Sequence, residues 1–182
     1  KAPFFVAQVA QQVLQARPQA SFTWVCEGRN HAAARGLFTD RAVLARVHFL
    51  PWQPQQQLRE LYDAHGIFVF PSLFEGFGKA FIEAMARGLC VVAADNGGMH
   101  DVIRHRESGV LAPTGDCEAM AQACMDLIDH PADFLRMAAA ARAAGQTYTW
   151  DRVGRETLAF YEQLLRQNAS GGTRPTLNTP GS

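Results

Sequence analysis

The sequence lacks the residue groupings that usually hold a metal ion. Its six histidines show neither HxxxH nor HxH spacing, and no Asp-x-Asp follows a predicted strand. No C-x-x-C pair is formed by the four cysteines, which are Cys26, Cys90, Cys117 and Cys124. Each of these groupings would bring several ligands to one ion. We therefore expect no metal site, and reduced core thiols of the kind found in cytosolic proteins.

The sequence also lacks net charge and long hydrophobic runs. Seventeen basic and seventeen acidic residues leave a formal charge of zero, so no overall field attracts nucleic acid or an anionic membrane. No apolar run approaches the length of a membrane span, and no basic-then-apolar leader opens the chain. We expect a cytoplasmic protein without a nucleic-acid partner. Because the first residue is Lys1 and not methionine, we also expect a piece of something longer.

The chain does contain enough apolar material for one sizeable core. Hydrophobic residues make up 48% of the 182 residues, which suits a single domain. We assign this domain to residues 1–166. Residues 167–182 are rich in Gly, Ser, Thr, Pro and Asn and show no apolar periodicity, so we expect a disordered tail there.

Short apolar runs alternate with stretches of helical periodicity along this domain. Strands are predicted at 21–26, 46–50, 67–70, 90–94 and 108–111. Helices are predicted at 3–16, at 31–44 with an irregularity near Gly36, and at 55–64. One helix begins at Lys79, and a separate short helix follows the loop 95–98 and ends at Ile103. Three more are predicted at 118–128, 131–144 and 150–166. The alternation implies an α/β fold with a Rossmann-like parallel sheet covered by helices on both faces. Ligands bind such sheets at the carboxyl ends of the strands, where we expect the loops 27–30, 50–53, 71–78 and 95–98 to gather.

The most informative stretch joins a strand to a helix. The apolar run 67–70 is typical of a strand buried on both faces, and Pro71 ends it. Gly76 and Gly78 then allow a sharp turn and a close approach to a bulky group. From Lys79 the apolar residues recur at helical spacing. A glycine-containing loop that enters a helix favours an anion, because the first N–H groups and the helix dipole are positive there.

The residues of this stretch resemble a known enzyme family. Glu75 and Glu83, with seven residues between them in E-G-F-G-K-A-F-I-E-A-M-A, resemble the paired glutamates of retaining GT-B glycosyltransferases, most closely family 4. C-V-V-A-A-D-N-G-G-M-H-D-V-I and E-S-G-V-L-A-P-T-G-D match that family's C-terminal domain in order and spacing, and the resemblance covers about residues 1–165. It implies one half of a GT-B fold that binds a nucleoside diphosphate sugar as substrate and needs no cofactor.

The resemblance also implies what is missing and what the whole enzyme does. The N-terminal domain, which mostly binds the acceptor, is absent, as are the usual first strand and its phosphate-binding arginine. We therefore expect retaining sugar transfer by the longer enzyme, a fragment that is inactive alone, and binding that does not depend on a metal. Peripheral association of the full enzyme with the cytoplasmic face of a membrane stays open.

The family's motif assigns roles to individual residues. Glu83 accepts hydrogen bonds from the ribose hydroxyls, and Glu75, as the catalytic residue, approaches the sugar and favours an oxocarbenium-like transition state. The remaining donor-binding residues contact phosphate or base or lie at the ligand edge: Lys1, Trp52, Phe77, Gly78, Lys79, Ala80, Gly97 and Gly98. His100 is a further candidate at that edge.

Simpler interpretations stay open beside these roles. Glu83 stands four residues before Arg87, so an exposed helical ion pair would explain it. Lys79 fits a surface lysine, Lys1 a frayed terminus and Trp52 an aromatic wedge under a loop. At the level of the whole protein, the alternatives are a non-catalytic nucleotide-binding module, or a sugar-nucleotide epimerase or phosphorylase of the same architecture.

Overall fold

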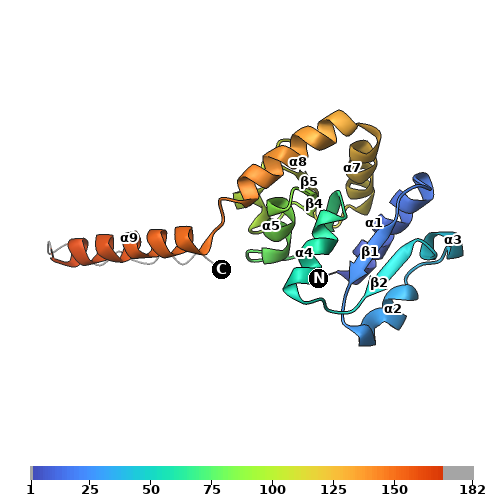
Figure 1. Cartoon of the computed structure of the whole chain (residues 1–182), viewed down its shortest axis with the longest axis horizontal. Coiled ribbons are helices and arrows are strands. Elements are labelled where there is room, and N and C mark those ends of the chain that lie inside the picture. Colours follow the sequence, from blue (N-terminus) through green and yellow to red (C-terminus); the bar gives the residue numbers. More distant parts are fainter. Residues whose placement is uncertain (1, 170–182) are drawn as a thin grey trace. The chain divides into compact units, whose positions relative to one another are not determined.

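The structure is a computed structural model that describes residues 2–169 (Figure 1). Its contacts divide the chain after Gln146 into two compact units, so the predicted domain 1–166 is split. The first unit holds the strands. The second holds the helix α9 (Trp150–Ala169), in which Arg166 pairs with Glu162 one turn earlier. The tail predicted at 167–182 is therefore helical at 167–169, and the rest of it lies outside the described residues.

The elements of the first unit follow the predicted alternation of helices and strands. In chain order they are α1 (Pro3–Ala16), β1 (Phe22–Val25), η1 (Gly28–Asn30), α2 (His31–Arg35), α3 (Arg41–Leu44), β2 (Val47–Leu50), α4 (Gln55–Asp63), β3 (Ile67–Phe70), α5 (Lys79–Ala86), β4 (Cys90–Ala94), α6 (Met99–Val102), β5 (Val110–Ala112), α7 (Cys117–Asp129) and α8 (Pro131–Gly145). No helix within residues 2–169 combines the length and apolarity that crossing a bilayer requires.

The helix predicted at 31–44 is two short helices. The irregularity expected near Gly36 falls between α2 and α3. Asp40 ends the intervening loop, and its carboxylate accepts hydrogen bonds from the N–H groups of Ala42 and Val43. An aspartate in this position starts a new helix, since it satisfies N–H groups that have no partner within the helix.

The strands form two parallel sheets in place of the single predicted sheet. β1 pairs with β2, and β3, β4 and β5 pair in that order. β4 is the most buried strand. Cys90, Val92 and Ala94 pack with residues of α1 and α7, and the alternation of side chains directs Val91 and Ala93 to the opposite face. Helices cover both faces, as predicted.

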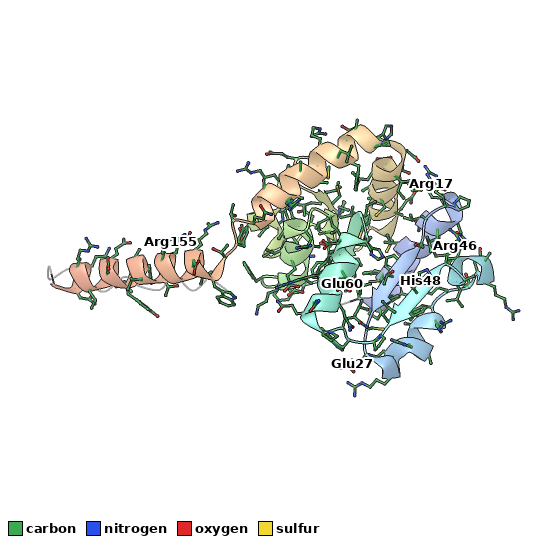
Figure 2. The ribbon with its side chains drawn as sticks, viewed as in Figure 1. Arg17, Glu27, Arg46, His48, Glu60 and Arg155 are labelled. Atoms are coloured by element: carbon green, nitrogen blue, oxygen red, sulfur yellow. The ribbon has the colours of Figure 1, made fainter. Side chains whose placement is uncertain are left out.

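A second, smaller core holds the β1–β2 sheet against α1. It contains Leu14, Val43 and Val47, with Trp24 and Phe49 stacked beside it at 5.9 Å between ring centroids. Arg46, labelled in Figure 2, holds the end of α1 in place. Its guanidinium donates to the carbonyl oxygens of Leu14 at 2.6 Å and of Arg17, Pro18 and Ala20 at 3.1–3.2 Å. A cation here complements the negative end of the helix dipole.

A large cavity lies between the two sheets. β1 and β3 each lie at the end of their sheet, and residues of both line a cavity of about 1150 Å³ together with α1 and α4. β3 is therefore not buried on both faces as predicted: only Phe70 is buried, and Ile67, Phe68 and Val69 are half-buried. His65 spans one part of this cavity, with Nε2 2.8 Å from the Thr23 hydroxyl.

Candidate functional site

The loop 71–78 between β3 and α5 is held at its start by polar contacts. Ser72 is buried, and its hydroxyl donates to the Phe74 carbonyl oxygen at 3.0 Å. Asn96, in the loop after β4, donates from Nδ2 to the Ser72 carbonyl oxygen at 2.8 Å. The loops that follow β3 and β4 are therefore tied together at the carboxyl edge of the sheet, as the predicted topology requires.

The loop ends at Gly78 in a conformation that favours glycine. Its φ is +72°, and a Cβ there would lie 2.5 Å from the Phe81 ring and 3.0 Å from Glu75 Cγ. Gly78 is the N-cap of α5, and having no side chain it leaves the first turn of the helix without a side-chain cap. The positive end of α5 is thereby available to an anion.

A cavity of about 400 Å³ lies beside this helix start. It brings together six of the residues predicted to bind or act on the donor: Trp52, Glu75, Gly78, Lys79, Ala80 and Glu83. Trp52 comes from the loop after β2, and it is 71% exposed, so its ring is open to stacking and is not a wedge under the loop. Both glutamates therefore share one cavity with the start of α5.

The other predicted site residues lie elsewhere. Phe77 is exposed and does not line this cavity, and neither do Gly97 and Gly98. Lys1 lies outside the described residues. His100 contacts Asp95, with 2.9 Å between Nε2 and Oδ1. The binding roles predicted for these residues remain predictions.

Gly97 and Gly98 pack against the loop that carries Glu75. The Gly98 N–H donates to the Glu75 carbonyl oxygen at 3.3 Å. A Cβ on Gly97, whose φ is +52°, would lie 2.1 Å from that carbonyl oxygen, and a Cβ on Gly98 would lie 2.4 Å from the Gly76 carbonyl oxygen. The two glycines are therefore required for close backbone packing beneath Glu75.

The ion pair proposed as a simple explanation for Glu83 is not formed. Within residues 2–169, Arg87 pairs with Asp63 at the end of α4, where its Nε donates to Oδ1 at 2.7 Å. This hydrogen bond raises the pKa of Arg87 and lowers the pKa of Asp63. Glu83 faces the cavity with Tyr62 as its neighbour. Burial raises the pKa of Tyr62, and the charge of Glu83 and a hydrogen bond with it raise that pKa further.

Five residues of the cavity wall are not among the predicted site residues: Gln53, Gln55, Leu58, Tyr62 and Phe70. Leu58 and Tyr62 have the spacing of a buried helix face, and Phe70 ends a predicted core strand. Their apolar periodicity explains why a sequence pattern marks them as core. The two glutamines follow the carboxyl end of a predicted strand, where ligands bind to parallel sheets. That position was the one feature of the sequence that could have marked them as site residues.

No group of three or more potential metal ligands lies together in the part of the chain that the structure describes. The absence of a metal requirement remains a prediction. Three cysteines are buried as expected, and burial raises the pKa of Cys90 and of Cys124 to about 12. Cys26, at the end of β1, is only half-buried.

Comparisons with known proteins show which family this chain resembles. The family model described as "Glycosyl transferases group 1" matches residues 1–130. D-inositol 3-phosphate glycosyltransferase of Rhodococcus erythropolis is 33% identical over 138 residues, which are 76% of this chain and 31% of that protein. The amylovoran biosynthesis glycosyltransferase AmsK of Erwinia amylovora is 37% identical over 107 residues, which are 56% of this chain and 26% of that one.

Solved structures share the fold. Sucrose-phosphate synthase from Thermosynechococcus elongatus is 26% identical with a TM-score of 0.75, over 90% of this chain and 44% of that one. Anabaena Alr3699/HepE in complex with UDP is 22% identical with a TM-score of 0.76, over 86% and 44% of the two chains. The chain thus spans less than half the length of these relatives. It belongs to the group 1 glycosyl transferase family and has the fold of the C-terminal domain of a GT-B glycosyltransferase.

Proposed function

We propose that this chain is the donor-binding domain of a retaining glycosyltransferase and that it binds a nucleoside diphosphate sugar. The observation that carries the proposal is the 400 Å³ cavity, in which Glu75 and Glu83 meet the start of α5. The cavity combines a positive helix end with two carboxylates. An anionic group and several hydroxyl groups on one ligand would satisfy both.

The diphosphate would lie at the start of α5. Gly78 provides no side-chain cap, so N–H groups of the first turn can donate to phosphate oxygens. Lys79 lines the same cavity and adds a positive charge at that end. These donors can hold a diphosphate without a metal ion, because backbone dipoles and a cation together offset its charge. Lys1 is proposed as a further phosphate contact.

The nucleoside and the sugar would occupy the two remaining parts of the cavity. Glu83 lies one turn into α5, where its carboxylate can accept from both ribose hydroxyls. Glu75 stands before the helix, on the side of the glycine loop, and would contact the sugar hydroxyls. Trp52 offers an exposed ring for the base, with Gln53 and Gln55 beside it as amide donors and acceptors.

Transfer would then be mainly electrostatic. The bond between the anomeric carbon and the diphosphate oxygen breaks, and a bond to the acceptor oxygen forms on the same face of the sugar. The acceptor's proton passes to the departing diphosphate. The start of α5 and Lys79 stabilise the negative charge that develops on the leaving group, and Glu75 stabilises positive charge on the sugar.

The whole activity would need polypeptide beyond this chain. The cavity between β1 and β3 supports the prediction that a strand is missing, because two parallel sheets end there with apolar walls. The acceptor site would belong to a further domain, since the related proteins are more than twice as long. We therefore propose that the chain alone binds donor and transfers nothing. Its cytoplasmic location and any membrane association of the full enzyme stay predictions.

Calorimetry with UDP, GDP and ADP and the matching monophosphates tests this proposal. One diphosphate should bind, and its monophosphate should bind roughly tenfold more weakly, because the second phosphate contacts the start of α5. Failure of all three diphosphates to bind, or equal affinity for the monophosphate and diphosphate, would contradict the proposal.

A further inference from the structure

Tyr62 is the one phenol on the wall of the donor cavity within residues 2–169. It lies in the last turn of α4, is only 8% exposed, and packs its ring against Phe68 with 6.0 Å between the ring centroids. A tyrosine held in this way has a fixed hydroxyl position, since its ring cannot turn away into solvent. The hydroxyl lies beside the first turn of α5, near the Ala80 carbonyl oxygen.

Two acceptors on α5 lie near this hydroxyl. The Ala80 carbonyl oxygen is 3.4 Å from Tyr62 Oη, which is long for an O–H···O hydrogen bond. Glu83 follows Ala80 by three residues, so it lies on the same face of α5, and it lines the same cavity. After burial, the charge of Glu83 and a hydrogen bond with Glu83 are the causes that raise the pKa of the Tyr62 phenol. Tyrosine has one proton to donate, and a charged carboxylate is a stronger acceptor for it than a neutral carbonyl oxygen.

We propose that Tyr62 is a positioning residue that fixes the Glu83 carboxylate for the ribose hydroxyls. The phenol donates to one carboxylate lone pair and leaves the others for the ligand. Without the phenol, Glu83 is an exposed side chain with several rotamers. Ordering it when the ligand binds costs conformational entropy, which lowers the affinity gained from its hydrogen bonds. The inference rests on the ribose role of Glu83 in the proposed function.

Binding of UDP and of 2′,3′-dideoxy-UDP to the 182-residue protein tests the inference, with the GDP pair in its place if the nucleotide panel selects GDP. The ratio of the two affinities reports the contribution of the ribose hydroxyls. Tyr62→Phe should lower this ratio roughly three- to tenfold and change the affinity for the dideoxy ligand little. Tyr161→Phe, which removes an exposed hydroxyl from α9, is the matched control and should change neither value.

A double-substitution cycle separates positioning from a merely structural role. In a Glu83→Gln background, Tyr62→Phe should have a smaller effect on the ratio, because the charged acceptor is gone. If Tyr62→Phe weakens both ligands equally, the positioning role is wrong and the proposed function stands. If the unaltered protein binds both ligands equally, the ribose role of Glu83 and this inference fail together. If it binds no diphosphate, the proposed function fails as well.

Discussion

The guanidinium of Arg87 binds the carboxylate of Asp63, and this pair joins the end of α5 to the end of α4. Arg87 is therefore directed away from Glu83, which lies four residues before it on α5. The two charged residues that a helical pattern pairs thus have separate partners. Arg87 belongs to an exposed contact between helices, and Glu83 belongs to the wall of the 400 Å³ cavity.

Arg87→Ala should leave nucleotide affinity unchanged and lower the melting temperature slightly, because the pair it removes is exposed. The loss should depend on pH. The pair lowers the pKa of Asp63 in the folded protein. Its contribution to the free energy of unfolding is therefore present above the unfolded pKa of about 3.9 and disappears as the pH falls through the pKa of the folded protein. Melting curves of the two proteins between pH 7 and pH 3 check this, and a constant difference would contradict it.

Glu83→Gln should weaken nucleoside diphosphate binding by about 1–2 kcal/mol and leave the fold intact. The amide keeps the shape of the side chain and removes the charge that two ribose hydroxyls would share. Calorimetry gives the affinity, and circular dichroism gives the melting temperature. An unchanged affinity together with a changed melting temperature would show that Glu83 serves stability and does not contact the ribose.

Much of the fold was predictable because local signals coincide with element ends. Pro3 and Pro131 start α1 and α8, and Asp116 caps α7 through its carboxylate, which accepts from the Ala119 N–H. The division into two sheets was not predictable from periodicity. Pairing depends on the neighbour of each strand, and β1 and β3 face a cavity where a neighbour would lie.

The residues of the candidate site also include some that the sequence predicted and some that it did not. The resemblance to the family's motif pointed to both Glu75 and Glu83, because a motif consists of residues that lie close together along the chain. Tyr62 is 21 residues before Glu83, and its spacing marks it correctly as core. Only the three-dimensional fold, in which Tyr62 on α4 contacts Ala80 on α5, brings its hydroxyl to the cavity. Gly97 and Gly98 lie at the sheet edge, where their ligand contact stays a prediction, and their close packing against Glu75 and Gly76 could not be predicted from the sequence.

Gly97→Ala should destabilise the protein by about 1–3 kcal/mol and also weaken diphosphate binding. Its Cβ would lie 2.1 Å from the Glu75 carbonyl oxygen, and the φ of +52° is unfavourable for alanine, so the loop carrying Glu75 must move. Gly28→Ala is the control, because nothing lies within 4 Å of its Cβ. Denaturant unfolding and calorimetry measure the two effects. Equal stability of the two variants would mean that the loop yields without strain.

Diphosphate binding should survive a chelator. In the proposed function, the donors at the start of α5 and Lys79 would supply the positive potential, and no ion would be needed to bridge the phosphates. Titrations with and without EDTA, using protein dialysed against EDTA beforehand, test this. Binding that disappears with EDTA and returns on addition of Mg²⁺ would show that the phosphates are held through a metal.

The last prediction concerns polypeptide that would precede Lys1 in the proposed longer enzyme. Three proteins are compared: the 182-residue chain, the same chain with about ten further residues before Lys1, and the chain with a complete N-terminal domain. The ten-residue extension should fill the cavity between β1 and β3, raise the melting temperature and reduce self-association, because the edges of both sheets become paired. It should not create activity.

Only the longest protein should transfer sugar from a radiolabelled donor to a mixture of acceptors. Transfer requires the acceptor to be held within a few ångströms of the anomeric carbon, and such positioning contributes roughly 7–11 kcal/mol to lowering the barrier. The residues that hold the acceptor would belong to the added domain. If the 182-residue chain turned over an acceptor at a rate near that of the longest protein, the catalytic centre would lie wholly within these residues. The two-domain interpretation would then be wrong, even if the extension still stabilised the fold.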